Sequence, residues 1–235
     1  MSTNKLFRLS GIALLLGGLF SLVGETTHML ENENPQTTLW VVASLLMLTG
    51  ALLLTLGVPA IYLRQAERMP IFGVVCFVLF FFAGIILGVG NGVVDAFILP
   101  YQRDAVVPVL TRFFLLGQPV EIAQSVINTG PYAGLTRFYA VGEFCKVFGG
   151  IPLAILTLRM GLLSRGASWL FIASILFSIV GVLLRSVLPL IDHVGLLMLF
   201  ISLAWYGYSL FFSARSQGSA SASIAASLSA QHILD

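Results

Sequence analysis

Composition defines the class of this protein before any motif is considered. Of its 235 residues, 58% are hydrophobic and only 9% carry a charged side chain, whereas roughly a quarter are charged in an average soluble domain. So few charges cannot hydrate the surface of a soluble fold of this length. A net charge of +2 provides no basic field large enough to suggest nucleic-acid binding, so we expect no nucleic-acid partner. We therefore expect an integral membrane protein whose main partner is the lipid bilayer.

The hydrophobic residues form runs long enough to cross a hydrocarbon core of ~30 Å, which requires about 20 helical residues. The first run follows Lys5 and Arg8 as a secretory signal would, but no small-residue cleavage pattern follows it, so we interpret it as a retained helix. The sequence predicts an all-α, polytopic six-helix transmembrane bundle within residues 1–212. Its spans are expected at about 9–29, 39–63, 71–99, 138–158, 167–188 and 194–212.

The distribution of basic residues predicts the orientation of the bundle. One side carries most of the basic residues of the short loops and chain ends: Lys5, Arg8, Arg64, Arg68, Arg159, Arg165 and Arg215. The first loop of the opposite side holds Glu31 and Glu33 and has no lysine or arginine. By the positive-inside rule, both termini are expected in the cytoplasm, and the loop at 100–137 is expected on the outer face of a bacterial cytoplasmic membrane.

Two segments lie outside the predicted spans. The loop at 100–137 contains an apolar stretch that is too short to cross, followed by Pro119 and Glu121, which are typical of a helix start. It therefore predicts one or two interfacial helices, which either anchor the surface or cover a pocket. The tail at 213–235 is rich in serine and alanine and is expected to be flexible or loosely helical in the cytoplasm.

Ionisable side chains at membrane depth cost several kcal/mol unless they are paired or hydrated, so each is a candidate functional residue. In this chain they gather in the predicted outer half of the bundle. The polar and ionisable residues there are Glu25, His28, Asn91, Asp95, Glu143, Lys146, Arg185, Asp192 and His193.

Residue spacing suggests which of these side chains share a helical face. Gly84, Gly88, Asn91 and Asp95 form one stripe on the third span, and a second stripe on the fifth span ends at Arg185. Glu143 and Lys146 are three residues apart on the fourth span. We predict a ligand or ion-pair pocket that comprises Asn91, Asp95, Glu143, Lys146 and Arg185. It either binds a small anionic or zwitterionic molecule or relays protons, or it only holds the helices together.

A metal site is the alternative use of the remaining residues. Glu25 and His28 are three residues apart, and Asp192 and His193 open the sixth span. Imidazole and carboxylate groups suit zinc or another divalent transition metal. Such a site would make the protein a membrane-embedded metalloenzyme, although no second Glu-x-x-His motif supports a di-iron bundle.

Gly84, Gly88 and Gly92 form a ridge of small residues on the third span. Ridges of this kind allow two helices to approach closely, and we expect this one to pack within the chain rather than to form a dimer or bind a partner subunit. No serine-histidine-aspartate arrangement, phosphate-binding loop, dinucleotide-binding motif or HExxH motif is present, so no enzyme class is indicated. A structural or accessory subunit is thus the third open function class.

Two stretches resemble a family of uncharacterised bacterial multi-span membrane proteins. One is Gly149-Gly150-Ile151-Pro152-Leu153-Ala154-Ile155-Leu156 with the following Leu158 to Arg165, and the other is the opening Phe7-Arg8-Leu9-Ser10-Gly11-Ile12-Ala13. Together with the apolar span that follows Arg165, they cover about a third of the chain. The resemblance implies a bacterial six-span protein and supplies no catalytic residues.

Overall fold

A computed structural model describes residues 3–30, 37–98, 133–184 and 191–231 of the chain. These residues form helices and the short turns between them, which confirms the all-α prediction. Five of the helices are long and apolar enough to cross a membrane, as the composition requires. The predicted interfacial helices, and Arg185 with them, lie outside the described residues.

The helices overlap the predicted spans, although α1 and α7 begin before them. The first two are α1 (Thr3–Leu30) and α2 (Thr38–Leu63). The third span is one continuous rod, which comprises α3 (Ile71–Ala83), η2 (Gly84–Gly90), α4 (Asn91–Val93) and η3 (Val94–Ile98). The remaining helices are α7 (Ala133–Met160), α8 (Arg165–Leu183) and α9 (Ile191–Gln231), and the short turn η1 (Ala66–Arg68) precedes α3.

Two predicted elements differ from the structure in extent. The apolar part of α8 runs from Arg165 to Gly181 and is shorter than the other spans within the described residues, so the sixth crossing stays a prediction. Helix α9 continues through most of the serine- and alanine-rich tail, to Gln231. The tail is therefore helical as far as Gln231, and its flexibility and its cytoplasmic location stay predictions.

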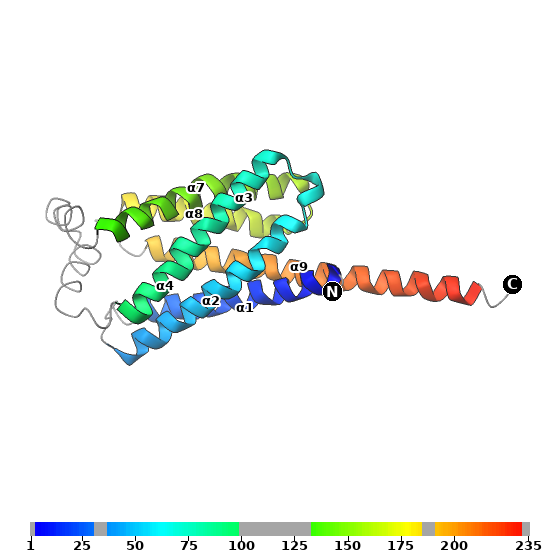
Figure 1. The fold of residues 1–235 in the computed structure, drawn as a ribbon, viewed down its shortest axis with the longest axis horizontal. Helices are drawn as coiled ribbons and strands as arrows, with labels where there is room; N and C mark the ends of the chain where they lie inside the picture. Colours follow the sequence, from blue (N-terminus) through cyan, green and yellow to red (C-terminus); the bar gives the residue numbers. More distant parts are fainter. Residues whose placement is uncertain (1–2, 31–36, 99–132, 185–190, 232–235) are drawn as a thin grey trace.

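Each helix packs beside its neighbour in the sequence, and the last helix packs against the first (Figure 1). Helix α1 lies between α2 and α9, α8 lies between α7 and α9, and α7 packs against α3 and η2. We call the end of the bundle at which α1 finishes and α9 begins the polar end, and the opposite end, near Arg64, Arg159 and Arg165, the basic end. The assignment of the basic end to the cytoplasm stays a prediction.

The third rod departs from regular α-helix over its second half. Residues Gly84–Gly90 and Val94–Ile98 form π-helical turns, in which the hydrogen bonds span five residues and each turn is wider than in an α-helix. The residues of the predicted stripe, from Gly84 to Asp95, were selected with 3.6 residues per turn and therefore do not stay on one face of this rod. Gly88 and Gly92 contact Ala51 and Leu48 on α2, whereas nothing lies within 4 Å of a methyl group placed on Gly84. Most of the glycine ridge thus packs within the chain.

Glycines on α1 allow very close contact with both of its neighbours. Toward α2, a methyl group on Gly17 would lie 2.8 Å from the carbonyl oxygen of Gly50, and one on Gly24 would lie 2.7 Å from that of Ala43. Toward α9, one on Gly11 would lie 2.8 Å from the carbonyl oxygen of Gly207. Lipid chains are as apolar as leucine, so close van der Waals contact of this kind is what holds membrane helices together.

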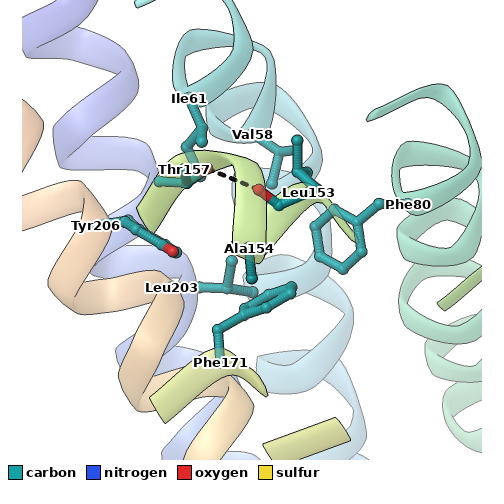
Figure 2. A pocket seen from close by; sticks show the side chains of 9 residues that line it. All are labelled: Val58, Ile61, Phe80, Leu153, Ala154, Thr157, Phe171, Leu203 and Tyr206. Carbon is teal, nitrogen blue, oxygen red and sulfur yellow. Dashed lines mark hydrogen bonds between the residues drawn. The ribbon is translucent and has the colours of Figure 1, made fainter. Parts of the chain in front are cut away.

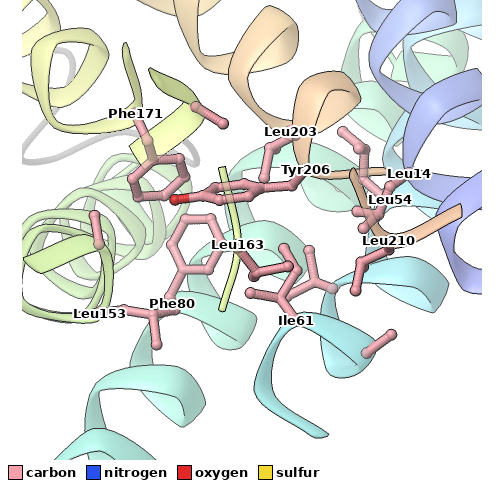
Figure 3. Packing of buried hydrophobic residues seen from close by; sticks show 14 of the residues in the cluster. Leu14, Leu54, Ile61, Phe80, Leu153, Leu163, Phe171, Leu203, Tyr206 and Leu210 are labelled. Carbon is pink, nitrogen blue, oxygen red and sulfur yellow. The ribbon is translucent and has the colours of Figure 1, made fainter. Parts of the chain in front are cut away.

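A cluster of buried hydrophobic residues fills the bundle toward the basic end. Figure 3 shows Phe80 and Leu153 packed near Phe171 and Tyr206, and Leu14, Leu54 and Leu210 packed beside them. The Tyr206 hydroxyl donates a hydrogen bond of 2.6 Å to Ser168 Oγ, which links α9 to α8. This hydrogen bond pairs two buried polar groups that belong to different helices.

A cavity of about 10 Å³ lies inside this cluster, and side chains of α2, α3, α7, α8 and α9 line it (Figure 2). A single water molecule already needs a probe-sized space of about 10–15 Å³. The cavity is therefore too small for an organic ligand, and a binding site has to be sought elsewhere in the bundle.

The glycine contacts predict a position-dependent response to the same substitution. Gly17→Ala should lower the free energy of unfolding by about 1–3 kcal/mol, because α1 and α2 must separate to accommodate the methyl group. Gly84→Ala, where the space is open, should change it by less than about 0.5 kcal/mol. Denaturant unfolding of both variants in the same detergent checks this, and equal effects would contradict the packing.

Candidate functional site at the polar end

Glu25 and His193 join α1 to α9 near the polar end. The Nδ1 atom of His193 lies 2.6 Å from Oε1 of Glu25. The Glu25 side chain is 4% exposed and that of His193 is 21% exposed, so the carboxylate is buried and the imidazole reaches the boundary of the bundle. A buried carboxylate is tolerated only with a partner of this kind, and removal of one partner of a buried pair typically costs about 3–5 kcal/mol.

His28 lies one turn farther along α1 and faces a different helix. Its ring stacks on Trp40 of α2 at 3.9 Å between centroids, with 6° between the ring planes. Its Nε2 atom lies 3.0 Å from Ser44 Oγ. Because three residues on a helix are about 60° short of a full turn, Glu25 faces α9 while His28 faces α2. The two side chains predicted to act together are thus divided between two interfaces.

Trp40 connects these residues to the third rod. Its indole Nε1–H donates a hydrogen bond of 3.3 Å to the backbone carbonyl of Asp95. On the same rod, Asn91 Oδ1 accepts a hydrogen bond of 2.8 Å from the Tyr139 hydroxyl of α7. The predicted site residues Asn91 and Asp95 are therefore held by two aromatic side chains from neighbouring helices.

Lys146 and Glu143 form an ion pair within α7. The Lys146 Nζ atom lies 2.6 Å and 2.9 Å from the two carboxylate oxygens of Glu143. The lysine side chain is 6% exposed, whereas the glutamate side chain is 47% exposed. Lys146 is nine residues past Arg137, where the apolar part of α7 begins, so it lies about 13 Å along the helix. The cation is thus buried, and its counter-ion is accessible from the surroundings.

Tyr139 lies on the same face of α7 as Glu143 and Lys146 but is absent from the predicted site. Tyr139, Glu143 and Lys146 follow an i, i+4, i+7 pattern and occupy one helical stripe. Tyr139 was not selected because its phenol is not charged, although its spacing from Glu143 was visible. Trp40 and Ser44 were missed for a different reason, since nothing in the sequence pairs α2 with His28.

The predicted sites are only partly assembled. Among the described residues, no three histidine, cysteine, aspartate or glutamate side chains lie close enough to hold a metal ion. Glu25 meets His193, but His28 is bonded to Ser44 instead, and the side chain of Asp192 is not described. Of the predicted pocket, Glu143 meets Lys146, and Asn91 meets Tyr139.

Comparisons with known proteins identify no relative. A scan against protein-family models finds no match, and searches of curated proteins and of solved structures find no similar chain. The resemblance to uncharacterised bacterial membrane proteins therefore stays a prediction. The chain is a multi-span integral membrane protein with paired polar residues at one end of its bundle.

Trp40 offers a test of this network. Trp40→Phe should lower the free energy of unfolding by about 0.5–1.5 kcal/mol, because it removes the indole donor to Asp95 while an aromatic ring still stacks on His28. Trp169 is 64% exposed, so Trp169→Phe is a matched control that should have little effect. Denaturant unfolding in detergent measures both, and an unchanged Trp40→Phe variant would contradict the hydrogen bond.

Proposed function

We propose that this protein binds a small zwitterionic or anionic molecule at Lys146 and Glu143, as a binding or transport protein of the membrane. One observation carries the proposal: a buried ammonium group is neutralised by a carboxylate that is 47% exposed. Burial of both partners of an ion pair carries a desolvation cost for each charge, whereas here the carboxylate stays accessible. An accessible counter-ion can instead be exchanged for a ligand.

The charge arrangement favours a zwitterion over a simple anion. A ligand carboxylate or phosphate takes the place of Glu143 at the Lys146 ammonium, and the ligand amine then pairs with the released Glu143 side chain. Both protein charges stay compensated, which is the requirement for charged groups at membrane depth. A simple anion also satisfies Lys146 but leaves Glu143 without its partner.

Neighbouring groups support recognition of a polar molecule at this position. Tyr139 lies one turn before Glu143 on α7 and is held by Asn91 through its hydroxyl. Asp95 lies four residues past Asn91 on the third rod, so its carboxylate belongs to the same polar end of the bundle. Hydroxyl, amide and carboxylate groups are the usual means by which a mostly apolar site orients its ligand.

The proposal extends to the side of the membrane from which the ligand arrives. The basic residues predict that the basic end faces the cytoplasm, which places Glu143 toward the outer face. The molecule is therefore taken from outside the cytoplasm of a bacterial cell. A metal-dependent reaction is not proposed, because Glu25 meets His193 whereas His28 is turned toward Ser44 of α2.

Ligand-induced stabilisation tests the binding site. Purified protein in detergent is heated with glycine, phosphoethanolamine, succinate or inorganic phosphate as probes. A zwitterionic probe should raise the melting temperature, since a ligand at one hundred times its Kd adds about 2.7 kcal/mol of stability. Lys146→Met should abolish this shift, and Lys5→Met, which removes an exposed lysine at the basic end, should preserve it.

A second variant separates the roles of the two charges. Glu143→Gln removes the internal counter-ion, so inorganic phosphate should bind about tenfold more tightly, a change of about 1.4 kcal/mol. Binding of phosphoethanolamine should weaken, because its amine loses a partner. No stabilisation by any of the four probes, or an unchanged shift in a folded Lys146→Met protein, would rule out the site.

A further inference from the structure

The interface between α1 and α9 has a regular register that includes Glu25 and His193. Starting near the basic end, a methyl group on Gly11 would lie 2.8 Å from the carbonyl oxygen of Gly207. Seven residues along α1, one on Gly18 would lie 2.7 Å from the carbonyl oxygen of Phe200.

Another step of seven residues on each helix arrives at Glu25 and His193, which lie 2.6 Å apart. The register of the two helices is therefore continuous. The ionisable pair occupies the layer that a third small-residue contact would fill.

The chemistry of this third layer differs from that of the two glycine layers. A glycine contact contains no ionisable side chain and does not change with pH. An imidazole, in contrast, ordinarily gains or loses its proton between pH 5 and 8. With His193 protonated, the pair consists of a cation and an anion and has no net charge. When the imidazolium releases its proton to water, Glu25 retains a negative charge at a position where its side chain is 4% exposed.

We propose that Glu25 and His193 form a proton-binding site that controls the separation of α1 and α9 at the polar end. Binding of one proton gives a neutral pair and a closed interface. Loss of the proton leaves a buried charge, and the ends of the helices move apart so that water can hydrate the carboxylate. The proton enters and leaves through His193, whose side chain is 21% exposed.

Other charged groups near this layer are few among the described residues. Helix α1 itself contributes His28, which faces α2, and α2 contributes the uncharged Trp40 and Ser44. The third rod contributes Asp95, whose carbonyl bonds Trp40, and α8 contributes Ser178 beside Gly195. The side chain of Asp192 and all of Arg185 lie outside the described part of the chain.

This site is separate from the proposed ligand site. It joins α1 to α9, whereas Lys146 and Glu143 lie on α7, which packs against α3 and α8. The proposed proton site is therefore independent of the proposed ligand site, and each can be tested without the other. The competing explanation is that the pair only fixes helix register, as single buried polar residues do in coiled coils.

Distance measurements between the two helices distinguish these explanations. Nitroxide labels on Val23→Cys and Val194→Cys report on the polar end, because both side chains are exposed. Labels on Leu9→Cys and Tyr208→Cys report on the basic end of the same interface and serve as the control. Both pairs are placed in full-length protein in which the buried Cys76 and Cys145 are replaced by alanine.

Pulsed electron resonance should then give a mean distance at the polar end that is several ångströms longer at about pH 8 than at about pH 5. The distance at the basic end should be the same at both pH values, because glycine layers carry no charge. Glu25→Gln should abolish the pH response, and so should His193→Gln if the first variant does not assemble. His28→Gln, which removes the neighbouring imidazole, should retain the response.

Two results would overturn the proton site. One is a wild-type distance at the polar end that does not change with pH. This result, combined with shifted or broadened distances in Glu25→Gln at every pH, would assign the pair a register role alone. The other is a pH response that persists in both Glu25→Gln and His193→Gln, which would place the titrating group elsewhere.

Discussion

Close backbone contact along α1 is the constraint on which the rest of this bundle depends. Helices in a bilayer gain nothing by hiding apolar surface from one another, so their association relies on contacts that lipid cannot match. Helix α1 achieves this on two faces. Ser10, Gly17 and Gly24 approach α2, and Gly11 and Gly18 approach α9, each series with steps of seven residues. The second interface joins the first helix to the last, so the helices form a closed ring in which each packs beside the next.

The two ends of the ring are stabilised in different ways. Toward the basic end, the large apolar side chains of the hydrophobic cluster fill the centre around a cavity of about 10 Å³. Toward the polar end, the same helix interfaces carry hydrogen-bonded and ionic layers instead. Such layers are costly unless every member is satisfied. Their presence at one end, away from the dense core, is why the proposed ligand and proton sites both lie there.

The candidate site residues were found from the sequence, but their partners on other helices were mostly not. The depth rule for charged side chains selected Glu25, His193, Glu143 and Lys146, and local spacing correctly paired Glu143 with Lys146 because both lie on one helix. The metal hypothesis groups Glu25 with His28, Asp192 and His193, and the structure brings His193 to Glu25 but not His28. His28 lies at the other interface, because a helix at the centre of two interfaces shows adjacent faces to different neighbours. The stripe through Gly84 and Asp95 drifted for another reason, since the π-helical turns alter the angle per residue.

By itself, the sequence determined that the chain is helical, that it belongs in a bilayer, and which segments form its long apolar helices, because hydrophobicity is a local property. The helix ends were not determined in this way, since α9 continues to Gln231, well past the predicted end of its span. The sequence also revealed which side chains are costly to bury. Only the tertiary structure decided which helices are neighbours, and therefore that Glu25 meets His193, that His28 stacks on Trp40 and that Asn91 receives the Tyr139 hydroxyl. The seven-residue steps of Gly11, Gly18 and Glu25 were visible in the sequence. Their partners on α9 became clear only from the packing of α9 beside α1. Helix order in a bundle arises from long-range packing, which no local pattern encodes.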